Sequence, residues 1–237
     1  MNTKKLLTTL TSLSLLSFIS CTNLETIKPL KIQTHSAGES GFLVNSHLIT
    51  GESEAILVDA QFTQSESAKV VELIKNSGKK LTTIYITHGH PDHYFGLDLV
   101  LKSFPEAKVI AKEGVVETIK STAKGKFDYW KPLYGNDLTD KIIVPQVFEG
   151  DELELEGQKI EILTFSEGES SHDTSLFIPS IKTLISGDVI YNKVHLWLVE
   201  HHEDQWLDNL RELAKLDIEN IYPGHGAVGA KVMIEEN

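Results

Sequence analysis

Cysteine and basic residues are scarce in this chain of 237 residues. It has one cysteine, Cys21, and 22 lysines and arginines against 34 acidic residues, which gives a formal net charge of -12. A single thiol excludes an internal disulfide and any metal site made of several thiolates. The excess of acid comes with no basic stripe and argues against nucleic acid as a partner, because such a surface repels a polyanion.

Long hydrophobic stretches are scarce as well, apart from the mostly apolar residues 6–19, which follow Lys4 and Lys5. This stretch is too short to span a membrane but typical of a signal-peptide core. It ends in Ser20-Cys21, which resembles a bacterial lipobox, although a plain secretory signal cut elsewhere is an alternative. We therefore predict a signal peptide over 1–20, a tether over 21–30 and one folded domain over 31–237.

The predicted leader implies an exported protein, a periplasmic or outer-membrane-anchored lipoprotein of a bacterium that contacts the membrane only through its lipid anchor. Removing residues 1–20 leaves 20 basic against 34 acidic side chains, a formal charge of -14. If Cys21 carries the lipid, the folded domain contains no thiol at all.

The segment His88-Gly89-His90-Pro91-Asp92-His93 places three imidazoles and one carboxylate on one short turn. Imidazole nitrogen and carboxylate oxygen are ligand types that zinc accepts. The turn follows the β-branched run 81–87, which predicts a buried strand, and α/β proteins usually keep their chemistry at the carboxyl ends of strands. One such histidine alone would indicate a surface or helix-cap residue, but the set predicts a metal site.

Three further residues of ligand type lie downstream, each beside a strand-like segment: His172 in 169–174, Asp188 after 184–187, and His225 in Pro223-Gly224-His225. The order and context of these motifs after H-x-H-x-D-H resemble the metallo-β-lactamase-fold superfamily, over nearly all of the chain beyond the first thirty residues. The resemblance implies an α/β (α+β) fold, a four-layer αββα sandwich, and a catalytic domain over 31–237.

The resemblance also implies a centre with two zinc ions, with iron or manganese as other metals that such ligands accept. The seven implied ligands are His88, His90 and His172 for the first ion, Asp92, His93 and His225 for the second, and Asp188 as a bridge. Two Zn²⁺ with two carboxylates and one bridging hydroxide would leave a charge of about +1, which suits an anionic or polarised carbonyl substrate.

We therefore expect a dinuclear zinc hydrolase in which a metal-bridging hydroxide cleaves a lactone, β-lactam or thioester in a small molecule, and Asp92 orients the hydroxide or relays its proton. A glyoxalase II-like thioesterase and a mononuclear iron persulfide dioxygenase of the same fold are alternatives. A non-catalytic binding protein on this fold would be expected to have lost ligands, and this chain has lost none. The sequence leaves the oligomeric state open.

Three residues near the implied ligands each allow two interpretations. Tyr191 resembles the lactonase tyrosine that helps to polarise the substrate carbonyl, or it is a half-buried aromatic at a strand end. Lys193 is a substrate anchor or an exposed lysine. Asp59 is a turn residue or the hydrogen-bond partner of a ligating imidazole, whose other N–H needs an acceptor, and the family position favours the partner.

The remaining sequence predicts alternating strands and helices, with helices over 64–76, 95–104, 113–123 and 204–216 and an opening hairpin of strands over 41–45 and 54–59. The segment 124–145 holds four aromatic residues among Gly, Pro and Asp and predicts a long loop or lid, whose aromatics contact the core or the substrate. His195, Trp197, His201 and His202 are candidates for pocket walls rather than ligands.

Overall fold

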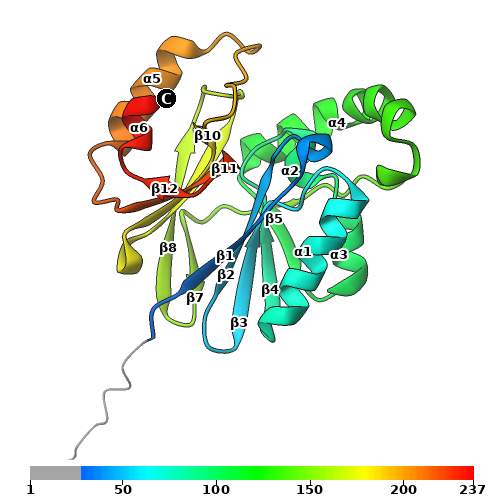
Figure 1. The fold of residues 1–237 in the computed structure, drawn as a ribbon, viewed down its shortest axis with the longest axis horizontal. Helices are drawn as coiled ribbons and strands as arrows, with labels where there is room; N and C mark the ends of the chain where they lie inside the picture. The colour runs from blue at the N-terminus through cyan, green and yellow to red at the C-terminus, as the bar shows by residue number, and fades with distance from the viewer. Residues whose placement is uncertain (1–27) are drawn as a thin grey trace, which may run out of the picture.

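The computed structural model describes residues 28–237, so the predicted signal peptide over 1–20, Cys21 and most of the tether lie outside the described residues. Two six-stranded sheets pack face to face, and helices cover the outer side of each (Figure 1). This arrangement confirms the four-layer αββα sandwich. No helix within residues 28–237 combines the length and the apolar character needed to cross a membrane.

The first sheet has the order β1-β2-β3-β4-β5-β6. Its strands are β1 (Lys31–Ser36), β2 (Asn45–Thr50), β3 (Glu54–Val58), β4 (Lys80–Tyr85), β5 (Lys108–Ala111) and β6 (Gln146–Val147). Strands β1 to β3 pair antiparallel and β3 to β6 pair parallel. The parallel pairs require crossover connections, which contain α1 (Gln64–Ser77), α2 (Pro91–Tyr94), α3 (Leu97–Ser103) and α4 (Glu113–Tyr134).

The second sheet has the order β12-β11-β10-β9-β8-β7. Its strands are β7 (Glu152–Leu155), β8 (Gln158–Phe165), β9 (Asp173–Ile178), β10 (Thr183–Asn192), β11 (Asn220–Gly226) and β12 (Gly229–Ala230). Only β10 and β11 pair in parallel, and α5 (Glu203–Leu213) connects them. The chain ends in α6 (Met233–Glu236), and three single turns of 3-10 helix occupy Glu39–Gly41, Gly135–Asp137 and Pro179–Ile181.

The alternation of side chains along the strands explains the layers. In β3, Leu57 joins the core under α1, α3 and α4, whereas Ile56 and Val58 join the core between the sheets. In β4, Ile84 likewise joins the core under the helices, and Tyr85 joins the core between the sheets. Successive residues of a strand point to opposite faces, so a strand buried on both faces reads as a continuous apolar run. A third cluster packs the second sheet against α5 and α6.

The loop predicted over 124–145 is wrong in its first half, because α4 continues to Tyr134 and contains Pro132 in its last turn. The aromatic residues Phe127, Trp130 and Tyr134 share one helix face and pack against the core under the first sheet. Tyr134 lies 4.9 Å from Phe62 between ring centroids. Tertiary packing of this stripe outweighs the weak helix propensity of glycine and proline.

The boundaries of the opening strands also differ from the prediction. The second strand of the first sheet begins at Asn45, where we expected the first predicted strand to end. Phe42 and Leu43, inside the predicted strand, adopt positive φ angles and form a turn instead. Helix α1, by contrast, ends one residue beyond the predicted position, and Gly78 caps it at φ 66°. A glycine accepts this left-handed conformation without strain.

Candidate metal centre

The histidine-rich turn lies at the carboxyl end of β4, as the sequence predicted. The chain leaves the strand at Tyr85 and enters the short helix α2, with His90 at its N-cap and Pro91 in its first turn. Proline suits this position because its missing N–H would have no helical partner there. His88 and His93 are fully buried, whereas His90 and Asp92 are partly exposed.

The second sheet supplies Asp188 and His225 from the adjacent parallel strands β10 and β11. Strand β10 changes register on either side of Gly187, and Asp188 follows directly. A Cβ atom at Gly224 would collide with the Asp188 carboxylate and the Gly187 backbone. The glycine of the Pro-Gly-His motif therefore lets β11 approach β10 closely enough to bring His225 beside Asp188.

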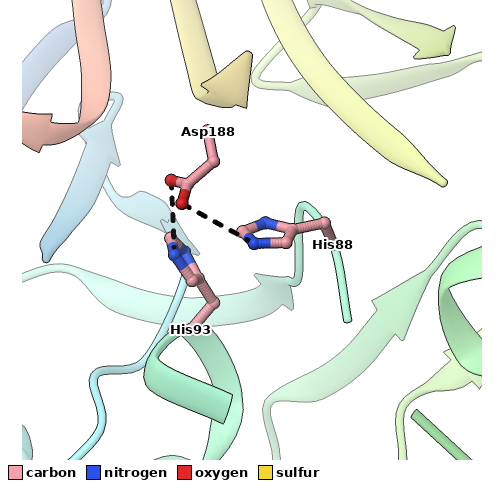
Figure 2. Close-up of side chains that lie close together, drawn as sticks. All are labelled: His88, His93 and Asp188. Atoms are coloured by element: carbon pink, nitrogen blue, oxygen red, sulfur yellow. Dashed lines mark ion pairs between the residues drawn. The ribbon is translucent and has the colours of Figure 1, made fainter. Parts of the chain in front are cut away.

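Six of the seven predicted ligands lie together in this structure, in groups that overlap through His88 and His93. Figure 2 shows Asp188 facing His88 and His93. The Asp188 Oδ1 atom lies 3.3 Å from His93 Nε2, and Oδ2 lies 3.8 Å from His88 Nε2 and 3.1 Å from His225 Nε2. Asp92 Oδ2 lies 3.6 Å from His93 Nε2 and 3.4 Å from His225 Nε2. Asp188 thus lies close to His88 on one side of the cluster and to His93 and His225 on the other.

His172 is the predicted ligand that the structure does not bring to the cluster. Its side chain is exposed and lies against the first turns of α4, with Nδ1 3.5 Å from Thr118 Oγ1. A Cβ atom at Gly114 would collide with its ring. The sequence placed a histidine correctly in the turn before β9, but spacing alone does not tell which residue of a turn points inward.

Glu169, which sequence reasoning did not single out, occupies the inward position of the same turn. It is 1% exposed. Its Oε1 atom lies 2.8 Å from His90 Nδ1, and its Oε2 atom lies 3.5 Å from His88 Nε2. His88, His90 and Glu169 form one group of possible ligands, and Asp92, His93 and His225 form another. Glutamate oxygen is a ligand type that zinc accepts, and the place of Glu169 in the same short turn as His172 was the signal that could have drawn attention to it.

The donor atoms of the cluster fit a metal ion. His88 Nε2, His93 Nε2, Glu169 Oε2 and Asp188 Oδ1 are buried and have no hydrogen-bond partner within the described residues. Leaving buried polar atoms unpaired costs free energy, and native proteins rarely leave several together. Because these four atoms are of ligand type and belong to overlapping groups of possible ligands, cations bound in those groups would satisfy them.

A second set of hydrogen bonds fixes how the histidines face. Asp59 accepts hydrogen bonds from the backbone N–H of Thr87 (2.9 Å) and the Thr87 hydroxyl (2.8 Å), and its Oδ2 lies 2.8 Å from His93 Nδ1. His88 Nδ1 lies 3.0 Å from the same hydroxyl. With Nδ1 as donor, each Nε2 is free to face the cluster. The structure therefore gives Asp59 the partner role that the family position favoured.

His225 is oriented from the opposite side. Its Nδ1 lies 2.7 Å from the Phe42 carbonyl oxygen, in the turn where Phe42 adopts a φ of 60°. The Asn45 side chain donates to the carbonyls of Pro223 and Gly226 and so holds both sides of the His225 loop. The end of β11 is thus fixed by residues from the beginning of the described chain.

The charges of the cluster depend strongly on one another. Burial and the neighbouring His93 hold the pKa of His88 well below its usual value. Burial also opposes the charged form of His90 and His225, but Glu169 and Asp188 respectively raise the pKa of each to about 10. Three carboxylates in a buried space thus draw positive charge onto nearby imidazoles, and a cation could supply that charge in their place.

Tyr191 is buried and lies inside the cluster rather than at its rim. Its hydroxyl donates to Asp188 Oδ2 at 2.7 Å and lies 3.3 Å from Glu169 Oε1. Its ring stacks on His225 at 5.1 Å between centroids, with an angle of 6° between the planes. These contacts place Tyr191 where it orients Asp188 and His225.

Residues from α4 and from the loop after β10 surround the partly exposed side of His90. Lys126 donates to the Gly89 carbonyl at 2.9 Å, and Glu200 Oε1 lies 3.8 Å from His90 Nε2. The Trp197 ring lies 6.3 Å from the His90 ring and is about half exposed. Lys193 is exposed. His195, His201 and His202 enter none of the possible metal groups within residues 28–237.

A family model described as the metallo-beta-lactamase superfamily matches residues 40–225. A probable metallo-hydrolase of Streptococcus pyogenes is 25% identical over 209 residues, which cover 84% of both chains. A hydroxyacylglutathione hydrolase of Prochlorococcus marinus is 25% identical over 171 residues, 70% of this chain and 57% of that enzyme. For several matched curated relatives, the chain spans only 30% to 58% of their length.

Among solved structures, a metallo-beta-lactamase from Pontibacter korlensis matches with a TM-score of 0.65 and 18% identity, over 87% of this chain and 96% of that one. Identity this low shows the fold alone. The two facing sheets, the buried cluster of histidines and acids, and the family match over residues 40–225 lead to one conclusion. The chain belongs to the metallo-beta-lactamase superfamily.

Proposed function

We propose that this protein is a hydrolase that holds two metal ions and cleaves a carbonyl bond, in a lactone, a β-lactam or a thioester, of a small molecule. The observation that carries the proposal is the pair of ligand groups, His88, His90 and Glu169 in one and Asp92, His93 and His225 in the other, with Asp188 within reach of both.

Two ions in such a centre would supply a nucleophilic water acidified to near-neutral pH and a Lewis acid for the carbonyl oxygen. The side chains of the chain would then orient and exchange protons. Asp92 is partly exposed, with Oδ2 within 3.6 Å of two imidazole nitrogens, and it faces solvent more than Asp188 does. We assign it the role of orienting the attacking water and accepting its proton.

The second ligand group favours a hydrolase over the iron dioxygenase. A mononuclear centre would need only one group of ligands, so the histidines and acids outside that group would have no ion to bind. His93 is instead oriented by Asp59, and His225 by the Phe42 carbonyl. Such supporting contacts are typical of imidazoles that bind metal.

Two observations bear on which carbonyl bond is cleaved. The Prochlorococcus relative is named as a hydrolase of hydroxyacylglutathione, which favours a thioester. The predicted leader over 1–20 favours a substrate met outside the cytoplasm, such as a lactone or a β-lactam. All three share a carbonyl carbon open to attack by water, so one panel of substrates separates them.

The test combines metal content, measured by mass spectrometry on the purified protein, with hydrolysis of a chromogenic β-lactam, an acyl-homoserine lactone and a glutathione thioester. We expect about two metal ions per chain and turnover of one substrate, with loss of both in Asp188→Asn. Asp208→Asn, at an exposed position of α5, is the matched control and should retain both. A protein that binds no metal and hydrolyses none of the three would contradict the proposal, and a single iron with oxygen uptake on a persulfide would replace it.

A further inference from the structure

Glu169 changes the chemistry of the first ligand group. The sequence predicted three imidazoles for this group, but the structure gives two imidazoles and a carboxylate. The carboxylate is almost fully buried, Oε1 lies 2.8 Å from His90 Nδ1, and Oε2 faces His88 Nε2 at 3.5 Å without a hydrogen-bond partner. A buried carboxylate whose two oxygens each face an imidazole, one of them without a hydrogen-bond partner, has the position of a metal ligand.

The turn that carries Glu169 is firmly built. Asp173, at the start of β9, accepts hydrogen bonds from the backbone N–H of Ser170 at 2.9 Å and from its hydroxyl at 2.7 Å. Asn209 of α5 donates to the Glu167 carbonyl. The Ser170 hydroxyl accepts from the backbone N–H of His172. These contacts fix which side chains point inward, and exchanging His172 for Glu169 would break several of them.

With Glu169 in place, the two ligand groups have the same composition, two imidazoles and one carboxylate each. Asp188 lies within 3.8 Å of a histidine in both groups. The centre then holds three carboxylates, Asp92, Glu169 and Asp188, where the sequence predicted two. Carboxylate oxygen is a harder ligand than imidazole nitrogen, and a set of two histidines and one carboxylate with open positions is typical of non-haem iron(II). Zinc binds both to three histidines and to two histidines with a carboxylate, so the carboxylate favours iron(II) relative to a histidine at the same position.

We propose that Glu169 shifts the metal preference of the first group from zinc toward iron(II). The inference rests on the proposed function in one respect, that the cluster binds metal ions at all. The proposal compares the iron-to-zinc preference of the site with Glu169 to that of the same site with a histidine. The comparison is needed because the metal content of any single protein also depends on the supply of each metal and on the general order of metal affinities.

The test measures iron and zinc by mass spectrometry in protein purified without oxygen from medium with equal iron and zinc. Glu169→His creates the all-histidine group, and we expect its iron-to-zinc ratio to fall by on the order of tenfold. Replacing a residue that only hydrogen-bonds to a metal ligand already changes metal affinity by about 10- to 100-fold, and the expected change is the lower end of that range. Glu169→Gln keeps the shape and removes the charge, and it should lose iron while the second group keeps its ion. His172→Ala is the matched control from the same turn and should leave both contents unchanged.

Each outcome decides between the two proposals. An equal iron-to-zinc ratio in the wild type and in Glu169→His would overturn the selectivity proposal and leave the hydrolase proposal standing. Loss of metal in His172→Ala would show that His172 is the ligand and overturn the assignment of Glu169. A wild-type protein that retains neither metal would overturn both. Circular dichroism checks that the variants fold, and if Glu169→His does not, the iron loss in Glu169→Gln carries the test.

Discussion

At the scale of single residues, Asp59 connects the two halves of the candidate centre. It bonds His93 directly and reaches His88 through the Thr87 hydroxyl. One buried carboxylate therefore orients an imidazole in each ligand group. Its φ angle of 59° is unusual for a residue other than glycine, and the three hydrogen bonds that it accepts help to hold that conformation.

Asp59→Asn should weaken metal binding by about 10- to 100-fold, because an amide is a weaker acceptor for His93 and can present its N–H to Thr87. Competition against a coloured chelator measures the affinity. Asp151→Asn, at an exposed carboxylate paired with Lys112, is the control and should bind as the wild type does. Equal affinity in Asp59→Asn would show that Asp59 has only a structural role.

His47 gives a second prediction that is independent of metal. It is buried in β2, with Nε2 3.1 Å from the Pro223 carbonyl, and burial lowers its pKa to about 4 from the usual 6.5. The unfolded chain therefore binds a proton that the folded protein excludes between these two values. Stability from this residue is complete above pH 6.5 and is lost as the pH falls toward 4, by at most about 3 kcal/mol.

Urea unfolding of the metal-free protein at pH 7 and pH 4.5 measures this loss. His47→Gln carries no titrating group at this position, so the fall in its unfolding free energy between the two pH values should be smaller by about 1 to 3 kcal/mol. A wild type and a variant that lose the same stability over this range would rule out a contribution from His47.

At the scale of elements, α4 shows how packing decides a structure that local sequence leaves open. Gly125 and Pro132 favour a loop, but Phe127, Trp130 and Tyr134 recur at helical spacing and meet Phe42, Phe62 and Phe95. Most aromatics of this segment therefore pack against the core, and only Tyr129, 65% exposed, points away.

Trp130→Ala should destabilise the protein by about 2 to 4 kcal/mol, because it removes a large side chain packed against Phe42 and Phe62. Tyr129→Ala, on the neighbouring and exposed position of α4, should change stability by about 0.5 kcal/mol or less. Denaturant unfolding curves of both variants provide the measurement. If the two substitutions cost the same, the packing of Trp130 against the core does not stabilise the protein.

Some elements could be predicted from the local sequence, whereas the inward-facing residue of the turn before β9 could not. The helix ending at Gly78, the turn after β4 and the two-sided burial of β4 follow from local signals: a capping glycine, a run of ligand residues and a continuous apolar segment. The exchange of His172 for Glu169 did not follow, because both residues lie in one polar turn. Asp173 and Asn209 decide which one faces inward, and Asn209 comes from a helix far along the chain.

At the scale of the whole molecule, the predicted leader remains a proposal about residues outside the described part of the chain. If Cys21 is lipidated, the wild type should fractionate with membranes when expressed with its leader in a bacterium, and Cys21→Ser should move to the soluble fraction. Immunoblots of the two fractions, with labelling by a fatty-acid analogue, measure this. A wild type that is soluble and unlabelled would favour the plain secretory signal.

The ligand groups draw on both sheets. His88, His90, Asp92 and His93 follow β4 of the first sheet, whereas Glu169, Asp188 and His225 belong to the second. An ion held among them is thus a cross-link between the two halves of the sandwich, and binding to the folded state alone adds to stability by mass action. Chelation should then loosen the seam between the sheets first, so that hydrogen exchange quickens at the ends of β4, β10 and β11 while α1 stays protected.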